Sequence, residues 1–181
     1  LLTSVTLARE KESGTLEQLL TSPVSPFEIL VGKLLPYILI ALLDGMLILI
    51  FALVVFGVPL VGSFWLLLLF EFIYVCTALS IGILISTFVK TQQVAMMIAV
   101  VTTLLPSVML SGFIFAVKNM PVFLQVLSHL IPAKYFLVII RGIMLKGAGL
   151  QVLAFQGGVL VCITLLLLTI ALLKFNAQVD A

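Results

Sequence analysis

Long apolar runs constrain this chain more than any other feature of its sequence. Four of them lie at about residues 34–56, 64–89, 94–117 and 152–173. Each is long enough to cross the roughly 30 Å hydrocarbon core of a bilayer, which takes about 20 helical residues. Backbone groups in hydrocarbon must satisfy one another, so such runs fold as helices. The sequence therefore predicts an all-α integral membrane protein, a helical bundle with about four full transmembrane helices.

Composition and charge support a multi-pass protein of the plasma membrane or the inner membrane. Hydrophobic residues make up 64% of the chain and charged residues 9%, whereas about 25% of residues are charged in soluble domains. The formal net charge of +2 is spread thinly, with no run of Lys or Arg that could neutralise several phosphates. The lipid bilayer is thus an expected partner, and nucleic acid is not.

One polar segment, residues 9–33, stands apart from the apolar runs. It holds four of the seven acidic residues and three of the nine basic ones. We predict that it is a coupling segment lying at the cytoplasmic face of the membrane. On this division residues 1–8 end a preceding transmembrane helix, and residues 34–181 form the transmembrane domain.

Local signals within this segment predict two short helices separated by a bend. Thr15 and Gln18 have the spacing of a capping box for a helix at about 16–21. A second helix would start with Ser25 as its N-cap and Pro26 at the first helical position. A solvated loop that contains turn residues is the alternative.

Residues 119–146 are harder to place in a membrane. They contain two apolar pieces, each too short to span. A single continuous crossing would bring Lys134 and Arg141 into or near the bilayer, at roughly 2.5–3.5 kcal/mol each. We therefore predict a re-entrant helical hairpin that dips into the outer leaflet.

The positive-inside rule gives little help with orientation. Under the hairpin arrangement, five basic residues share the side of Arg9 and four lie on the other. The first set is Arg9, Lys11, Lys33, Lys90 and Lys174, and the second is Lys118, Lys134, Arg141 and Lys146. A fully spanning arrangement would exchange Lys146 and Lys174 and would fit the rule slightly better.

Asp44 and Glu71 are the acidic residues inside the predicted spans. Ionisable groups are costly in hydrocarbon, so they are candidate translocation residues by default. The spacing places Asp44 about 15 Å from the inner edge and Glu71 about 10 Å from the outer one. They could form a proton relay or cation-binding pair, or they could only make hydrogen bonds within the bundle or face a watery cleft.

The sequence offers no catalytic or metal-binding constellation. His129 has no second His or Cys at ligand spacing, which argues against a metal site. The one Gly-Lys pair, Gly32-Lys33, is followed by Leu34 and lacks the flanking residues of a P-loop. We therefore expect no cofactor on this chain and no enzyme activity of its own.

Two runs resemble a known family. The run EKESGTLEQLLTSPVSPFEILVGKLLP resembles the cytoplasmic coupling region of ABC type 2 permeases, the membrane subunits of ATP-driven exporters. The run LSGFIFAVKNMPVFLQVLSHLIPAKYFLVIIRGIMLKGAGL resembles the end of the family's fifth span and its outward re-entrant hairpin. Together the two runs cover about a third of the chain at the expected separation.

The resemblance implies an architecture and a set of site residues. The four spans would be the third to sixth of the permease, and an earlier half with the first span would be missing. Residues matching the coupling motif, which would bind the ATP-binding subunit, are Glu12, Gly14, Thr15, Glu17, Pro23, Glu28, Gly32 and Lys33. Those matching the hairpin motif are Ser111, Gly112, Asn119, Pro121, Pro132 and Arg141.

The function implied is export of an amphiphilic drug, lipid or glycolipid. ATP and Mg²⁺ would be bound by the partner subunit, and the permease would work with a second copy or a homologous half. The alternative function is an ion-coupled secondary transporter using Asp44 and Glu71. That alternative predicts internal repeats, which the sequence does not show, and gives residues 9–33 no role.

Overall fold

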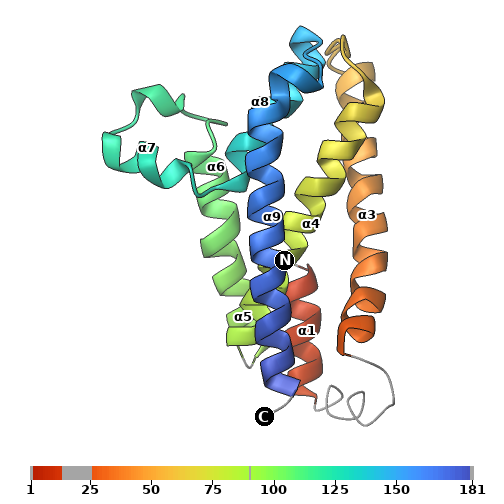
Figure 1. Ribbon diagram of the computed structural model, residues 1–181, viewed down its shortest axis with the longest axis vertical. Helices are drawn as coiled ribbons and strands as arrows, with labels where there is room; N and C mark the ends of the chain where they lie inside the picture. The colour runs from red at the N-terminus through yellow and green to blue at the C-terminus, as the bar shows by residue number, and fades with distance from the viewer. Residues whose placement is uncertain (1, 14–25, 90, 180–181) are drawn as a thin grey trace.

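The computed structural model describes residues 2–13, 26–89 and 91–179, and this part of the chain is helical without strands (Figure 1). The elements are α1 (Leu2–Glu12), α3 (Pro26–Val54), α4 (Phe64–Phe88), α5 (Gln92–Ala99), the π-helical turn η1 (Val100–Leu104), α6 (Leu105–Leu110), the 3₁₀ turn η2 (Val117–Asn119), α7 (Val122–Ser128), α8 (Pro132–Lys146) and α9 (Leu150–Val179). The predicted all-α fold is confirmed.

Four segments of the described chain are long and apolar enough to cross a membrane. They are Val31–Val54, Phe64–Phe88, Gln92–Leu110 and Leu150–Lys174. A further pair, α7 and α8, is bent by 79° at the break between them. The predicted set of about four transmembrane helices is therefore confirmed, and the placement of the bent pair in the outer leaflet stays a prediction.

The start of the first full span differs from the prediction. Helix α3 does begin at Pro26, but it runs without interruption through Pro36 into the span. The separate second short helix is therefore wrong. Apolar residues on both sides of Pro36 favour one continuous membrane helix, and such helices tolerate a proline. The predicted helix at 16–21 lies outside the described residues.

The third span is shorter than predicted and the last is longer. Helix α6 ends at Leu110 rather than near Val117. The chain turns there because Gly112 has a φ of +88°, a conformation that other residues rarely adopt. Helix α9 begins at Leu150 and continues past Leu173 to Val179, because no proline or glycine interrupts its last turns.

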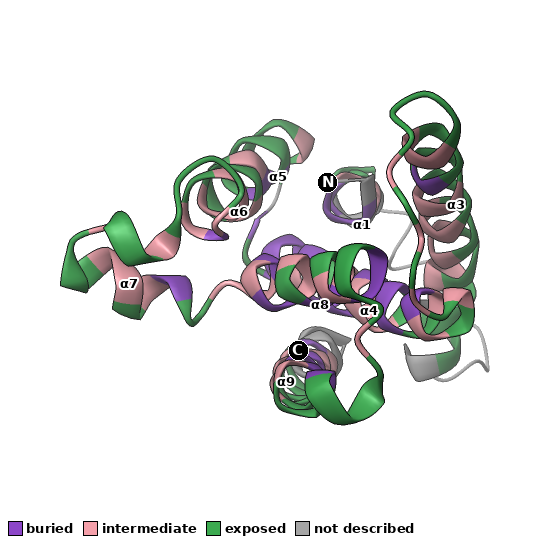
Figure 2. Cartoon of the chain, turned by 90° about the horizontal axis from the view of Figure 1, so that it is seen from above, coloured by how far each residue is buried: buried purple, intermediate pink, exposed green. Residues whose placement is uncertain are grey.

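Helix α4 lies in the middle of the bundle. Seen from above, it stands between α3, α9 and α1, with α8 over it (Figure 2). The largest core cluster joins α4 to α3, α8 and α9 through Leu49, Leu67, Phe70, Tyr135, Ile139, Ile143, Met144, Leu153 and Leu160. A hydrogen bond of 2.6 Å between the Thr77 and Thr164 hydroxyl oxygens also links α4 to α9.

Glycines allow the helices around α4 to approach closely. A Cβ added at Gly157 of α9 would lie 2.6 Å and 2.8 Å from two ring carbons of Phe70. On the other side, a Cβ at Gly82 would lie 3.2 Å from the Cβ of Thr3 in α1. Gly82 of α4 therefore faces α1 and Gly157 of α9 faces α4, as is common for small residues in membrane bundles.

We expect Gly157→Val to destabilise the full-length protein by about 1–3 kcal/mol, the usual cost of overpacking. The added side chain collides with the Phe70 ring and separates α9 from α4. Gly158→Val is the matched control, since a Cβ at Gly158 has nothing within 4 Å. Thermal unfolding of the detergent-solubilised protein measures the difference. Equal melting temperatures for the two variants would show that this contact does not limit the packing.

Candidate functional site

Three side chains connect the end of α1 to the start of α5. An oxygen of the Glu12 carboxylate, Oε2, accepts hydrogen bonds from the Gln92 backbone N–H at 3.1 Å and from the Gln92 side-chain amide at 3.2 Å. The Arg9 Nε donates to the Gln92 side-chain oxygen at 3.1 Å. We call Arg9, Glu12 and Gln92 the α1–α5 junction.

Glu12 acts as a cap for α5 from another helix. Gln92 is the first residue of α5, and the N-cap residue Thr91 makes no capping side-chain hydrogen bond. A carboxylate at a helix N-terminus satisfies free backbone N–H groups and interacts favourably with the helix dipole. Beside the junction, Ala8, Val89 and Ala95 form a small buried cluster. The position of α5 is thus tied to the last turn of α1.

The other residues of the predicted coupling motif fall into two groups. Gly14, Thr15, Glu17 and Pro23 lie outside the described residues. Glu28, Gly32 and Lys33 belong to the first turns of α3. Of the motif residues that the structure describes, Glu12 alone enters the α1–α5 junction, and its partner Gln92 was not predicted. The sequence does place Gln92 in a polar turn directly before an apolar helical run, and this position could have indicated a residue at a helix start.

Helix α5 continues into α6 through an irregular turn. The Leu105 backbone N–H bonds to the Val100 carbonyl, which widens η1 into a π-helical turn. Pro106, which has no N–H to donate, follows directly in α6. The irregular turn therefore lies directly before the start of α6, which contains Pro106. Such π-helical turns often occur at functional sites in membrane and soluble helices.

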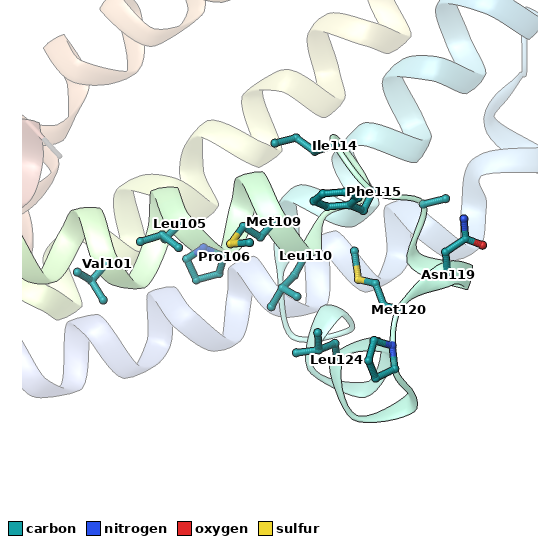
Figure 3. A pocket seen from close by; sticks show the side chains of 12 residues that line it. Val101, Leu105, Pro106, Met109, Leu110, Ile114, Phe115, Asn119, Met120 and Leu124 are labelled. Atoms are coloured by element: carbon teal, nitrogen blue, oxygen red, sulfur yellow. The ribbon is translucent and has the colours of Figure 1, made fainter.

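An apolar cavity of about 700 Å³ lies between α6 and the segment that follows it (Figure 3). Its lining is almost entirely hydrophobic, with Asn119 as the one polar side chain among the residues that line it. They are Val101, Leu105, Pro106, Met109, Leu110, Ile114, Phe115, Ala116, Asn119, Met120, Pro121 and Leu124. This size and character are typical of binding sites for drug-sized molecules. We call it the α6 cavity.

Two residues of the predicted hairpin motif meet at the edge of this region. The Arg141 Nη1 of α8 donates to the Gly112 backbone carbonyl at 3.4 Å. Gly112 forms the turn after α6, so the bond ties α8 to the end of the third span. The neighbouring Ser111 hydroxyl is buried and makes no hydrogen bond within the described part of the chain.

The remaining motif residues have structural positions. Pro121 is the N-cap residue of α7. Pro132 begins α8, where a proline costs no hydrogen bond. Asn119 ends η2 and lines the α6 cavity.

Side chains also hold the bend between α7 and α8. The Lys134 ammonium donates to the Ser128 hydroxyl at 3.0 Å, and the Tyr135 hydroxyl donates to the His129 carbonyl at 3.0 Å. Tyr135 is buried in the core. The ring of the next residue, Phe136, stacks on Tyr74 of α4 with ring centroids 4.3 Å apart. The bend closes on α4, which explains why both rings point inward.

The His129 ring lies 2.8 Å from the Gln125 carbonyl oxygen, within hydrogen-bonding distance. Among the described residues no group of three or more His, Cys, Asp or Glu side chains could hold a metal ion.

The two intramembrane acids have different environments. Asp44 is exposed on the surface of α3, whereas Glu71 is 7% exposed in the interior. The Glu71 carboxylate lies against Gly45, the residue next to Asp44. The Glu71 side chain therefore reaches the level of Gly45, and the depths of the two acids in the bilayer stay a prediction. Their side chains are not brought together as a pair.

Comparison with known proteins adds the family. The model of the ABC-2 type transporter family matches residues 1–145. The chain is 37% identical over 147 residues to the probable multidrug ABC transporter permease YbhS of Escherichia coli K12, covering 81% of this chain and 39% of YbhS. It is 37% identical over 152 residues to the probable multidrug permease YbhR, covering 84% of this chain and 41% of YbhR. It is 33% identical over 179 residues to the inner membrane transport permease YhhJ, covering 98% of this chain and 48% of YhhJ.

Apolar helices arranged in this way define a multi-pass membrane protein. The chain belongs to the ABC-2 type transporter family. It spans less than half the length of these three relatives. No solved structure matches it.

We expect Glu12→Ala to increase hydrogen exchange in the first turn of α5 by about fivefold, the equivalent of about 1 kcal/mol for a lost cap. The Gln92 backbone N–H then has no carboxylate acceptor. Exchange measured by mass spectrometry on residues 91–99 of the full-length protein reports the change. Gln93→Ala is the control, because Gln93 is exposed and does not belong to the junction. An unchanged rate in Glu12→Ala would mean that the junction does not hold α5.

Proposed function

We propose that this chain is the membrane-spanning part of an ABC exporter that moves an amphiphilic drug, lipid or glycolipid. ATP hydrolysis on a separate ATP-binding subunit supplies the energy. The α6 cavity is the observation that carries the proposal, because it offers about 700 Å³ of apolar space beside a transmembrane helix. Membership of the ABC-2 family and the multidrug names of two relatives support it.

The lining of the α6 cavity suits cargoes of varied shape. Met109 and Met120 both border it. Methionine side chains are flexible and polarizable, so they adapt to different apolar surfaces. Asn119 supplies a hydrogen-bonding group at the edge, which would orient the polar end of an amphiphile.

The α1–α5 junction provides a route for force. In the proposal, closure of the ATP-binding subunit pushes on residues 14–25, which follow α1 in the chain. Glu12 transmits this displacement to Gln92 and so to the start of α5. Helix α5 leads through η1 to α6, which lines the cavity. A π-helical turn is a natural place for the helix to change its bend during such a motion.

The partners follow from the same arrangement. The ATP-binding subunit holds ATP and Mg²⁺ and docks on the motif residues of the coupling segment. A second permease copy or a homologous half covers α5, whose side chains Met96 and Met97 are exposed. The separation of Asp44 from Glu71 gives no support to the alternative of an ion-coupled carrier built on that pair.

Co-purification tests the ATP-binding partner. The full-length permease should purify with a soluble ATPase, and deletion of residues 14–21 or Glu17→Ala should remove it. Gln93→Ala is the control for folding at the same face of the bundle. Transport without such a partner, accompanied by dissipation of a proton gradient, would contradict an ATP-driven exporter.

Substitution in the α6 cavity tests the cargo site. Leu105→Trp should lower ATP-driven transport of a fluorescent amphiphile at least about tenfold, because the indole fills the space at the wall of the cavity. Leu104→Trp is the matched control, since Leu104 is exposed to a similar extent, 52% against 48%, but does not line the cavity. Uptake into inverted membrane vesicles measures both variants. Equal losses in the two would show that bulk on this helix, rather than the cavity, is what matters.

A further inference from the structure

A second, smaller cavity lies on the other side of α4, where α3, α4 and α8 meet. Its volume is about 210 Å³. It is lined by Gly45, Ile48, Leu49, Ala52, Leu67, Glu71, Phe136, Ile140 and Met144. Glu71 supplies the charged group in this otherwise apolar lining. We call it the Glu71 cavity.

The Glu71 carboxylate enters the cavity without a protein partner. The residue is 93% buried, and among the described residues no side chain or backbone group forms a hydrogen bond or ion pair with it. Gly45 makes room for it, because a Cβ at that position would collide with the Glu71 Oε1. The carboxylate therefore reaches the backbone of α3 through a gap that only a glycine leaves open.

Two of the three cationic side chains of α8 are held by hydrogen bonds elsewhere, and the third, Lys146, is exposed. Lys134 donates to Ser128, and Arg141 donates to the carbonyl of Gly112, both on the α6–α7 side. Neither lines the Glu71 cavity. An ionised carboxylate in hydrocarbon without a counter-ion is costly, and a cation from outside the described chain would offset that cost.

The lining decides which kind of cation fits. Ca²⁺ takes six to eight oxygen ligands and Mg²⁺ takes about six, whereas the cavity offers the two oxygens of one carboxylate. An organic ammonium group needs one acidic partner and tolerates apolar neighbours. The ring of Phe136 borders the cavity and would add attraction to a cation. The volume equals about seven water molecules at ~30 Å³ each, enough for an ammonium head group.

We propose that the Glu71 cavity binds the protonated amine of an amphiphile, with the carboxylate of Glu71 as the counter-ion. The hydrocarbon part of the amphiphile lies along the exposed apolar surface of α3, which includes Ile48 and Phe51. The inference rests on the proposed function only in taking this amphiphile as a cargo. A free cationic amphiphile and the head group of an aminolipid share this chemistry.

Binding to the full-length permease with its ATP-binding subunit tests the site directly. The protein is placed in phosphatidylcholine nanodiscs, and affinities are measured for dodecylammonium and for the uncharged dodecanol, with empty nanodiscs as the baseline. Glu71→Gln should weaken dodecylammonium binding by about tenfold or more, since bonds to a charged group are the stronger ones. Dodecanol binding should change less than twofold.

Two further variants control for folding and geometry. Asp44→Asn removes the neighbouring acid on the exposed face and should leave both affinities unchanged. Gly45→Ala displaces the Glu71 carboxylate and should weaken dodecylammonium binding while it keeps dodecanol binding.

Addition of phosphatidylethanolamine to the nanodiscs distinguishes a free cationic amphiphile from an aminolipid as the ligand. Competition with dodecylammonium in the unmodified protein but not in Glu71→Gln assigns the site to the aminolipid, and absence of competition assigns it to the free amphiphile.

Several results would overturn the proposal. Undiminished dodecylammonium binding in Glu71→Gln would mean that the carboxylate binds only a proton, and an equal loss for both probes would mean that Glu71 is structural. ATP-driven transport of a neutral amphiphile in the same preparation separates this inference from the proposed function. If transport is intact but Glu71→Gln weakens dodecylammonium binding no more than dodecanol binding, the amine site alone is rejected. Failure of ATP-driven transport in the unmodified protein rejects the exporter.

Discussion

Close packing around α4 is the interaction on which the rest of the structure depends. In a membrane, helices gain little from the hydrophobic effect against one another, so association relies on contact area and a few hydrogen bonds. Glycines at 82 and 157 bring α1 and α9 against α4, and the Thr77–Thr164 bond adds a polar link. Helix α8 closes the same core with Tyr135, Ile139 and Ile143. The two candidate sites lie on opposite sides of this central helix.

The two ends of the α5–α6 helix have different chemistry. At one end the junction of Arg9, Glu12 and Gln92 is polar and joins two elements that are distant in sequence. At the other end α6 borders an apolar cavity. Because the π-helical turn η1 lies between α5 and α6, the two helices can change their relative angle when α5 is displaced. This arrangement connects the α1–α5 junction to the α6 cavity along one span.

Sequence patterns predicted the positions of the spans but not every end. Apolar runs located all four, because the bilayer requires about 20 apolar residues in a row. The apolar run 94–117 predicts a span that ends near Val117, yet α6 ends at Leu110, and α3 passes without a break through Pro36. Tyr135 lies in the core because the bend between α7 and α8 turns it inward, a position that no local pattern indicates.

The sequence by itself determined the class of protein, the number of spans and the motif residues, since hydropathy and capping are local properties. Only the tertiary structure decided which of these residues meet. Glu12 and Gln92 are joined across 80 positions, and Glu71 faces Gly45 rather than pairing with Asp44. Such pairings depend on the rotation of each helix about its axis. That rotation is set by glycine contacts and side-chain volumes between helices, which no single run of the sequence contains.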